Sequence, residues 1–324
     1  MSTKETIHFL TIKTLDDILR CINLASLLEL SGWPKPGNVH RTQNFESTRF
    51  EHFLAGIAAI QPNFRMLCER IAQKSFIRDE DYELIKLGQF FKNAAEKMMM
   101  WQKGGNVIVG HILILAPLAS AAMLCLQSSN TTIQNFKKLL QKIIDNSTVE
   151  DAINLYEALR LCNPGGLGTV DRYDVHNNNS LKSLQEDGIT LKAIFELSKG
   201  RDLISSEYAT NFNITLNEGL PYFLDTFHQF QDINIATVNT FLYLLALHPD
   251  SLILKKSGSE PAMHVSNCAS KILEKGGISS EEGLTLTINL DKELQKKKGK
   301  LNPGTTADII AGVLFSALIF GLRY

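Results

Sequence analysis

Apolar residues recur along most of this chain at the three- and four-residue spacing of an amphipathic helix. Leu15, Ile18 and Ile22 begin the first such run, and Thr14 precedes them with the side chain of a helix cap. The alternation of apolar and polar residues that marks a strand is almost absent, with 284–290 as the exception. The pattern therefore predicts an all-α fold without any βαβ unit.

The same periodicity predicts a series of helices of ordinary length. Besides the first, they cover residues 47–60, 79–100, 108–127, 131–145, 148–161, 190–198, 201–212, 215–230, 235–248, 260–275, 280–298 and 305–322. The longest polar stretch, 171–187, contains three consecutive asparagines and is predicted to be a loop, either a boundary or a lid. Because the apolar helices on both sides of it need partner faces, we expect one domain over 1–324.

Composition excludes several classes of protein. Hydrophobic residues make up 44% of the 324 residues, enough for a large buried core. The formal net charge is only -1, which argues against nucleic acid or an anionic membrane surface as a partner. Five widely spaced cysteines without a C-x-x-C pair, and no signal-peptide pattern at the N-terminus, lead us to expect a reduced cytoplasmic protein.

One stretch is apolar enough to resemble a membrane span. Residues 107–126 contain no formally charged residue and are long enough to cross a bilayer. His111, Pro117 and Ser120 interrupt the stretch, and no comparable partner span follows. We therefore expect a buried helix, with His111 as a core residue rather than a ligand.

Familiar catalytic motifs are absent, and glycine-rich polar turns take their place. The sequence has no H-E-x-x-H, Walker A, G-x-S-x-G or dinucleotide-binding pattern. Three turns share a Pro-Gly element, at 34–38, 163–168 and 302–308. Each adjoins an apolar helix, which suggests that the three loops gather at one mouth.

The last of these turns has the features of a helix start. Thr305 and Asp308 have the spacing of an N-cap and its reciprocal partner, and the exposed N–H groups of such a terminus can hold a phosphate. From spacing alone, Asp308 could equally serve only as a cap. The number of nearby lysines, carboxylates and glycines favours a site for a polyphosphate with Mg²⁺.

At these residues the chain resembles the triphosphoribosyl-dephospho-CoA synthase family, particularly its shorter, archaeal-type members. The matching segments are E-L-x-x-x-P-K-P-G at 29–37, G-G-N with Gly110 at 104–110, P-G-G-L-G at 164–168 followed by Asp174-Val175, the stretch 201–209, D-S-L-I-L-K-K-x-G at 250–258 and N-P-G-T-T-A-D at 302–308. They cover the chain nearly end to end. The resemblance implies an all-helical enzyme that joins ATP to 3′-dephospho-CoA with loss of adenine, making a prosthetic-group precursor for acyl carrier subunits.

The resemblance also implies roles for individual residues. Glu29 or Asp174 is expected as the catalytic base, and Asp250 and Asp308 as the carboxylates that hold Mg²⁺. The residues expected to bind the nucleotide and its phosphates are Lys35, Gly37, Asn38, Arg41, Asn106, Gly165, Gly166, Lys256, Asn302, Gly304, Thr305 and Thr306. The expected partners are small molecules, ATP and a CoA-like acceptor.

Two segments depart from the family pattern. Where the synthases carry G-A-H-x-D-M, this chain has 44–50, and where they carry N-T-H-K-G it has Asn106-Val107-Ile108-Val109-Gly110. Apolar side chains cannot bind polar groups of an acceptor, so dephospho-CoA is expected to be a poor acceptor. Two alternatives stay open: transfer of a phosphoribosyl or nucleotidyl group to another cofactor precursor, and a non-catalytic nucleotide-binding protein.

Overall fold

Helices form nearly all of the regular structure in the computed structural model, which describes residues 9–165 and 172–324. Within those ranges there is no strand, only the isolated bridges between Phe9 and Thr132 and between His40 and Gln43. The all-α prediction is confirmed. Residue 171, where the predicted polar loop begins, lies outside the described residues.

The elements are as follows. The first half of the chain contains α1 (Leu15–Ser31), α2 (Phe50–Ala59), α3 (Gln61–Ala72), the 3-10 helix η1 (Asp79–Ile85), α4 (Leu87–Trp101), α5 (Val109–Ser128), α6 (Ile133–Asp145) and α7 (Val149–Cys162). The second half contains α8 (Ser180–Glu186), α9 (Leu191–Ser198), α10 (Leu203–Ala209), the π-helix η2 (Ile214–Gly219), α11 (Leu220–Phe230), α12 (Ile233–Leu247), α13 (Ser251–Ser257), α14 (Ser259–Glu274), the 3-10 helix η3 (Gly277–Ser279), α15 (Glu281–Gln295) and α16 (Gly304–Ile319).

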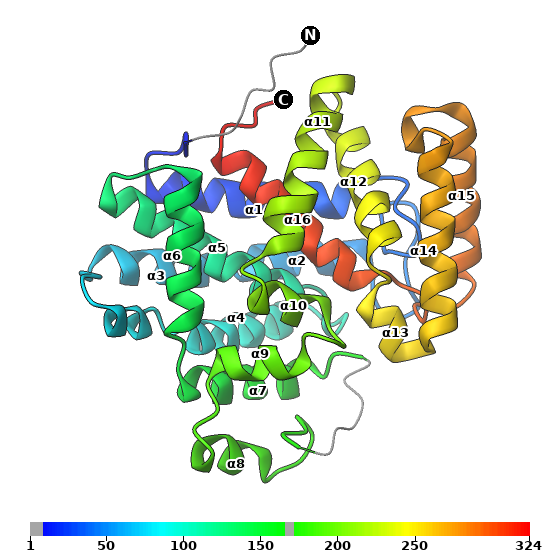
Figure 1. Cartoon of the computed structure of the whole chain (residues 1–324). Coiled ribbons are helices and arrows are strands. Elements are labelled where there is room, and N and C mark those ends of the chain that lie inside the picture. Colours follow the sequence, from blue (N-terminus) through cyan, green and yellow to red (C-terminus); the bar gives the residue numbers. More distant parts are fainter. Residues whose placement is uncertain (1–8, 166–171) are drawn as a thin grey trace.

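Two apolar helices form the centre of the molecule. Every residue of α5 from Gly110 to Cys125 is buried, as is every residue of α16 from Ile309 to Ile319. In Figure 1, α16 crosses the middle of the view, and it packs against both α1 and α5. A helix that is apolar on all sides has to be covered on all sides, which explains why other helices surround this pair.

Among the described residues, α5 is the one helix long and apolar enough to cross a membrane. Within the protein, 89% of its most apolar window is buried, mainly against α16, α6 and α3. This burial is what the sequence led us to expect of a core helix.

The observed elements differ from the predicted ones at several points, one of which is α13, a helix that was not predicted. The helix predicted over 79–100 is broken at Lys86, whose left-handed backbone (φ 54°) separates η1 from α4. Helix α3 was not predicted, although Pro62 in its first turn is a helix-start signal. The stretch predicted as a loop over 171–187 includes α8, so it is not simply a loop.

The cysteines are all free, as predicted. Four of the five are buried, and Cys268 is half-buried.

Candidate active site

Four ionisable side chains meet where α1, α5 and α16 approach one another. We call Glu29, Lys35, His111 and Asp308 the central cluster. Glu29 lies in the last turn of α1 and Lys35 in the loop that follows, with 4% and 1% of their side chains exposed. The Lys35 ammonium forms an ion pair with the Glu29 carboxylate and also donates to the Glu29 carbonyl oxygen at 2.6 Å. A buried charge needs such partners, so each of the two residues holds the other in place.

His111 connects Glu29 with Asp308. Its Nε2 atom lies 3.3 Å from Oε2 of Glu29 and 3.7 Å from Oδ1 of Asp308. Its Nδ1 atom is buried and has no hydrogen-bond partner among the described residues. His111 is buried, as expected of a core residue, and it also lies beside two carboxylates. Helical spacing shows that the residue is buried, but it cannot show which distant side chains lie next to it.

Gly110 allows the close approach of α5 and α16. A Cβ atom at this position would lie 1.9 Å from Oδ2 of Asp308, well inside van der Waals contact. A glycine is therefore required here if the Asp308 carboxylate is to lie beside His111.

Burial changes the protonation of the cluster. It raises the pKa of Asp308 to about 7, against the opposing effect of His111, and lowers the pKa of His111 to about 4. It also lowers the pKa of Lys35. With 21% of its side chain exposed against 3% for His111, Asp308 is the more open to solvent. A carboxyl group that titrates near neutral pH and reaches solvent can exchange a proton with a bound molecule.

Asp250 lies near this cluster and links two helices. Its Oδ1 accepts from the N–H groups of Leu252 and Ile253 at 2.8 and 3.1 Å, and caps α13. Its Oδ2 accepts from the backbone N–H and the hydroxyl of Thr306 at 2.7 and 2.8 Å. Both oxygens are thus occupied, and Asp250 ties α13 to the start of α16.

The start of α16 differs from the predicted one. Its N-cap is Pro303, and no side chain caps the helix, so Thr305 and Asp308 do not form a capping box. Thr305 and Thr306 are 7% and 1% exposed, and the Thr306 N–H donates to Asp250. The expectation of a helix start with exposed N–H groups free for a phosphate was therefore wrong.

Two of the Pro-Gly loops pack directly against each other. Gly37 has a left-handed backbone (φ 76°), and a Cβ atom there would lie 2.7 Å from the Leu301 carbonyl oxygen and 3.1 Å from Pro303. The Gly37 N–H donates to Asp291 of α15 at 2.9 Å. The predicted gathering of these two loops is confirmed.

The third Pro-Gly loop reaches the same side of the molecule through α13. A Cβ atom on Gly165 would lie 2.7 Å from Cε of Lys256, a residue in the last turn of α13. Gly304, at the start of α16, similarly lies against Leu252 of α13. Gly166 lies outside the described residues.

The remaining predicted residues are more scattered. Asn38 is buried, and its carbonyl oxygen accepts from Gln295 at 2.7 Å. Asn106 accepts from the Val109 N–H at the start of α5 at 3.1 Å, and Oδ1 of Asn302 is buried without a hydrogen-bond partner among the described residues.

Arg41 and Asp174 lie outside the central cluster. Arg41 has 73% of its side chain exposed and pairs with Glu51 at 2.9 Å. Asp174 lies between α7 and α8, where it accepts from the His176 N–H at 2.7 Å; α8 is at the lower edge of Figure 1.

Each of the two segments that depart from the family pattern contacts a residue near the other in sequence. The Thr48 hydroxyl donates to the Gly104 carbonyl oxygen at 2.8 Å, and a Cβ atom on Gly56 would lie 2.8 Å from Val107. Ile108 is 1% exposed and belongs to the hydrophobic core. The apolar residues of 107–109 therefore contribute to the packing of α2 and α5.

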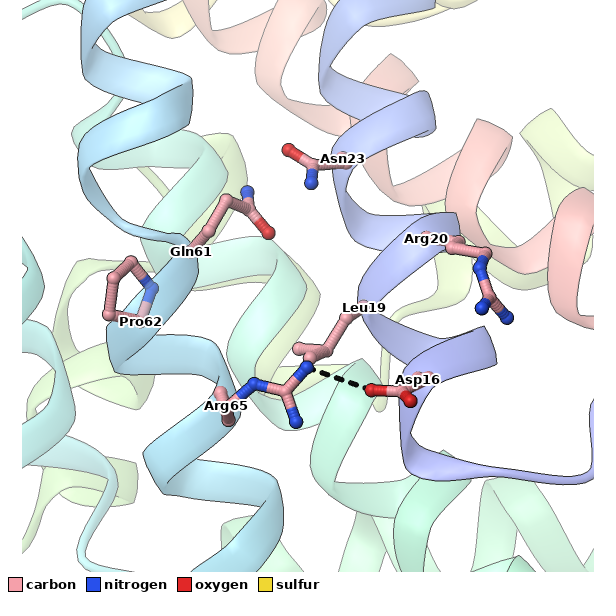
Figure 2. A pocket seen from close by; sticks show the side chains of 7 residues that line it. All are labelled: Asp16, Leu19, Arg20, Asn23, Gln61, Pro62 and Arg65. Carbon is pink, nitrogen blue, oxygen red and sulfur yellow. Dashed lines mark hydrogen bonds and ion pairs between the residues drawn. The ribbon is translucent and has the colours of Figure 1, made fainter.

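A separate hollow on the surface has a different character. A hollow of about 550 Å³ lies between α1 and α3. Figure 2 shows the side chains that line it. It is lined by Asp16, Leu19, Arg20, Asn23, Gln61, Pro62 and Arg65. Arg65 pairs with Asp16 at 2.8 Å, and Arg20 pairs with Asp17 at 2.7 Å. Since both arginines already have carboxylate partners and no residue of the central cluster lines it, we do not place the active site there.

Comparison with known proteins identifies the family. A model of the ATP:dephospho-CoA triphosphoribosyl transferase family matches residues 15–323. Proteins of Salmonella gallinarum and Salmonella typhimurium, named as probable 2-(5″-triphosphoribosyl)-3′-dephosphocoenzyme-A synthases, are 30% identical over 109 residues. That alignment spans 34% of this chain and 35% of each relative, about a third of their length.

A solved structure has the same fold. The crystal structure of an Archaeoglobus fulgidus protein, assigned as a triphosphoribosyl-dephospho-CoA synthase, matches with a TM-score of 0.61 and 24% identity, over 83% of this chain and 100% of that one. The family model extends from the first turn of α1 to beyond the end of α16, and so includes every residue of the central cluster. The chain therefore belongs to the ATP:dephospho-CoA triphosphoribosyl transferase family.

Proposed function

We propose that this protein transfers the triphosphoribosyl group of ATP to a hydroxyl of a dephospho-CoA-like acceptor and releases adenine. The observation that carries the proposal is the central cluster, in which Glu29, His111 and Asp308 converge from three separate helices. Two of the three come from segments that resemble the family, 29–37 and 302–308, and the third directly follows Gly110 of another. Membership of the family supports the same assignment.

The reaction needs one proton acceptor and an environment that stabilises positive charge. The acceptor hydroxyl forms a bond to the ribose carbon that bears adenine, and the bond from that carbon to the adenine nitrogen breaks. The hydroxyl proton passes to a base, while the departing adenine takes up a proton. Carboxylates near the ribose stabilise the oxocarbenium-like charge that develops during this exchange.

We assign the proton acceptor to Asp308. Its carboxylate is partly exposed, and burial raises its pKa to about 7, which suits a general base at neutral pH. Glu29 is less suited, because one of its carboxylate oxygens pairs with Lys35 and the other faces His111. Glu29 and His111 then hold Asp308 in position, and Glu29 contributes negative charge.

The protein's carboxylates do not fit a Mg²⁺ cage. Both oxygens of Asp250 are occupied by N–H and O–H donors. No group of three or more His, Cys, Asp or Glu side chains in the described part of the chain is arranged to hold a metal ion. We therefore propose that Mg²⁺ binds with the nucleotide, mainly through its phosphates, as is common for this ion.

A second candidate differs only in the acceptor. Val107, Ile108 and Val109 stand where the synthases carry polar residues, and Val107 and Val109 are partly exposed. A polar group of the acceptor left unpaired against such a surface costs about 1 to 3 kcal/mol. This observation favours an acceptor other than dephospho-CoA, with ATP kept as the donor.

Mass spectrometry of reaction mixtures tests both candidates. The purified protein is mixed with Mg-ATP and either dephospho-CoA or a panel of other hydroxyl-bearing cofactor precursors, and adenine release is measured in parallel. We expect adenine release with at least one acceptor, slow or absent transfer to dephospho-CoA, and loss of release in Asp308→Asn. Rapid stoichiometric transfer to dephospho-CoA would overturn the second candidate, and no adenine release with any acceptor would count against the proposal itself.

A further inference from the structure

Lys35 in the central cluster and Lys255 of α13 already have carboxylate partners. Lys35 pairs with Glu29, and Lys255 pairs with Asp202. The N–H of Thr306, which a phosphate could have used, donates to Asp250. A triphosphate carries several negative charges, so its site must be sought among cations that have no carboxylate partner.

Such cations occur together at one turn. Lys296, Lys297, Lys298 and Lys300 follow the end of α15, and all four are exposed. Lys298 and Gly299 both have left-handed backbones (φ 50° and 78°), which reverse the chain and keep the four lysines within one turn. With Lys256, whose Nζ lies 3.4 Å from the Gly299 carbonyl oxygen, we call this group the lysine turn.

The lysine turn lacks neutralising partners. None of the ion pairs found in the described residues includes a lysine of this group, although other lysines such as Lys275 and Lys192 have carboxylates at 2.9 and 2.8 Å. Lys256 is exposed, and its sole described hydrogen bond is the long one to Gly299. Desolvation by the surrounding protein lowers the pKa of Lys256, against the opposing effect of the Asp250 carboxylate. Five cations outside every described ion pair, in a chain of net charge -1, form a local positive potential.

The lysine turn lies at the edge of the candidate site. Gly165, in the third Pro-Gly loop, lies against Lys256. Leu301, one residue beyond the turn, packs on Gly37, and α16 with Asp308 begins three residues later at Gly304. The ring of Phe45 lies 3.5 Å from the position that a Cβ atom on Gly299 would take. The turn therefore contacts the third Pro-Gly loop and the segment that departs from the family pattern, and the chain runs on from it to Leu301, which packs on the first Pro-Gly loop.

We propose that the lysine turn binds the triphosphate of the nucleotide, outside the buried cluster, while the ribose reaches toward Asp308. The inference rests on the proposed function for its choice of nucleotide, but its chemistry is that of any linear polyphosphate. Lysine ammonium groups on flexible side chains act as point charges and fit a polyphosphate without requiring one geometry. Binding through them should weaken as salt screens the charges.

Titration calorimetry with Mg-ATP and with inorganic tripolyphosphate tests the proposal. The variant carries Lys297→Gln, Lys298→Gln and Lys300→Gln together. The matched control carries Lys13→Gln, Lys74→Gln and Lys138→Gln, which remove the same charge from exposed lysines outside every described ion pair. We expect the turn variant to bind both ligands at least about tenfold more weakly, and the control to change by less than about twofold.

The outcomes separate this inference from the proposed function. Equal affinities for turn variant and wild type, with circular dichroism showing both folded, would overturn the inference, as would a wild type that binds neither ligand at millimolar concentration. Weaker binding of both ligands by the turn variant supports the inference even if no adenine is released. That last combination would reject the proposed transferase activity and leave a polyphosphate-binding site.

Discussion

His111 sets the charge balance of the central cluster at the level of single residues. Burial holds its pKa near 4, so the imidazole is neutral at physiological pH. Because Lys35 is paired to Glu29, Asp308 is the carboxylate of the cluster without a lysine partner. Burial favours the protonated form of Asp308 and raises its pKa to about 7. The Asp308 carboxyl can therefore gain or lose one proton near neutrality without leaving a large uncompensated charge.

Gly110 provides a direct test of this arrangement. In Gly110→Ala the added methyl group would overlap Oδ2 of Asp308, since the new Cβ atom would lie only 1.9 Å from that oxygen. The carboxylate must move, and a displacement of about 1 Å in a catalytic group can lower a rate by roughly 100-fold. We expect a loss of adenine release of that order, measured by initial rates under saturating Mg-ATP.

Gly200→Ala is the control for that experiment. Nothing lies within 4 Å of the Cβ position of Gly200, which precedes α10 on the surface. Its adenine release should equal that of the wild type. If Gly110→Ala is as active as Gly200→Ala, the close contact between Gly110 and Asp308 has no catalytic importance.

At the scale of elements, a buried carboxylate shapes the turn between α10 and η2. Glu207 is 0% exposed and accepts from the N–H groups of Ile214 and Thr215 at 2.8 and 3.0 Å. Those groups begin the π-helix η2, where the backbone would otherwise lack acceptors. Burial raises the pKa of Glu207 from its ordinary 4.5 to about 7.

The raised pKa predicts a pH dependence of stability. The folded protein binds this proton more tightly than the unfolded chain, so the contribution of Glu207 is fully present below pH 4.5 and is lost as the pH rises through about 7. The loss amounts to about 3 kcal/mol at most. In urea unfolding at pH 5 and pH 7.5, Glu207→Gln should lose less stability across that interval than the wild type does.

Glu46→Gln is the matched control, because Glu46 is exposed and forms no described ion pair. Its stability difference between the two pH values should match that of the wild type. A slope for Glu207→Gln equal to both would show that Glu207 titrates in the folded protein as it does in the unfolded chain.

The sequence predicted those helices that have a regular apolar face. The runs behind α5, α12 and α16 are long and regular, so their existence followed from periodicity. The break at Lys86 did not, since it depends on a single left-handed residue inside a helical pattern. Helix α8 is short and polar, and its sequence alone resembles a loop.

The site was predictable only in part, for a related physical reason. Turn chemistry indicated that the Pro-Gly loops matter, and Gly37 does pack against Leu301 and Pro303. Spacing could not reveal that Asp250 would occupy the start of α16, because its partner Thr306 is 56 residues away. Which carboxylates remain available for chemistry is decided by such long-range contacts.

At the scale of the whole molecule, the two ends of the chain are tied together. Helix α1 packs against α16, so the first and last helices share one interface. The buried hydrophobic residues form a cluster that extends from Leu10 to Leu322. Neither half can bury its apolar faces without the other, which supports our proposal that 1–324 is a single domain.

A single domain of this kind should unfold in one cooperative transition. Trp33 follows α1 and is hydrogen-bonded to Asn234 of α12 through its backbone, whereas Trp101 ends α4. The two indoles are 43% and 69% exposed, so Trp33→Phe and Trp101→Phe should each disturb the fold little and leave one reporter. In urea, we expect the fluorescence midpoint of each variant to coincide with its own midpoint by far-UV circular dichroism, and the two variants to agree within about 0.5 kcal/mol. The shared core of α1, α5 and α16 is the reason to expect a common loss of structure. An earlier transition at Trp101 alone would contradict this and would mean that α2 to α7 unfold as a separate unit.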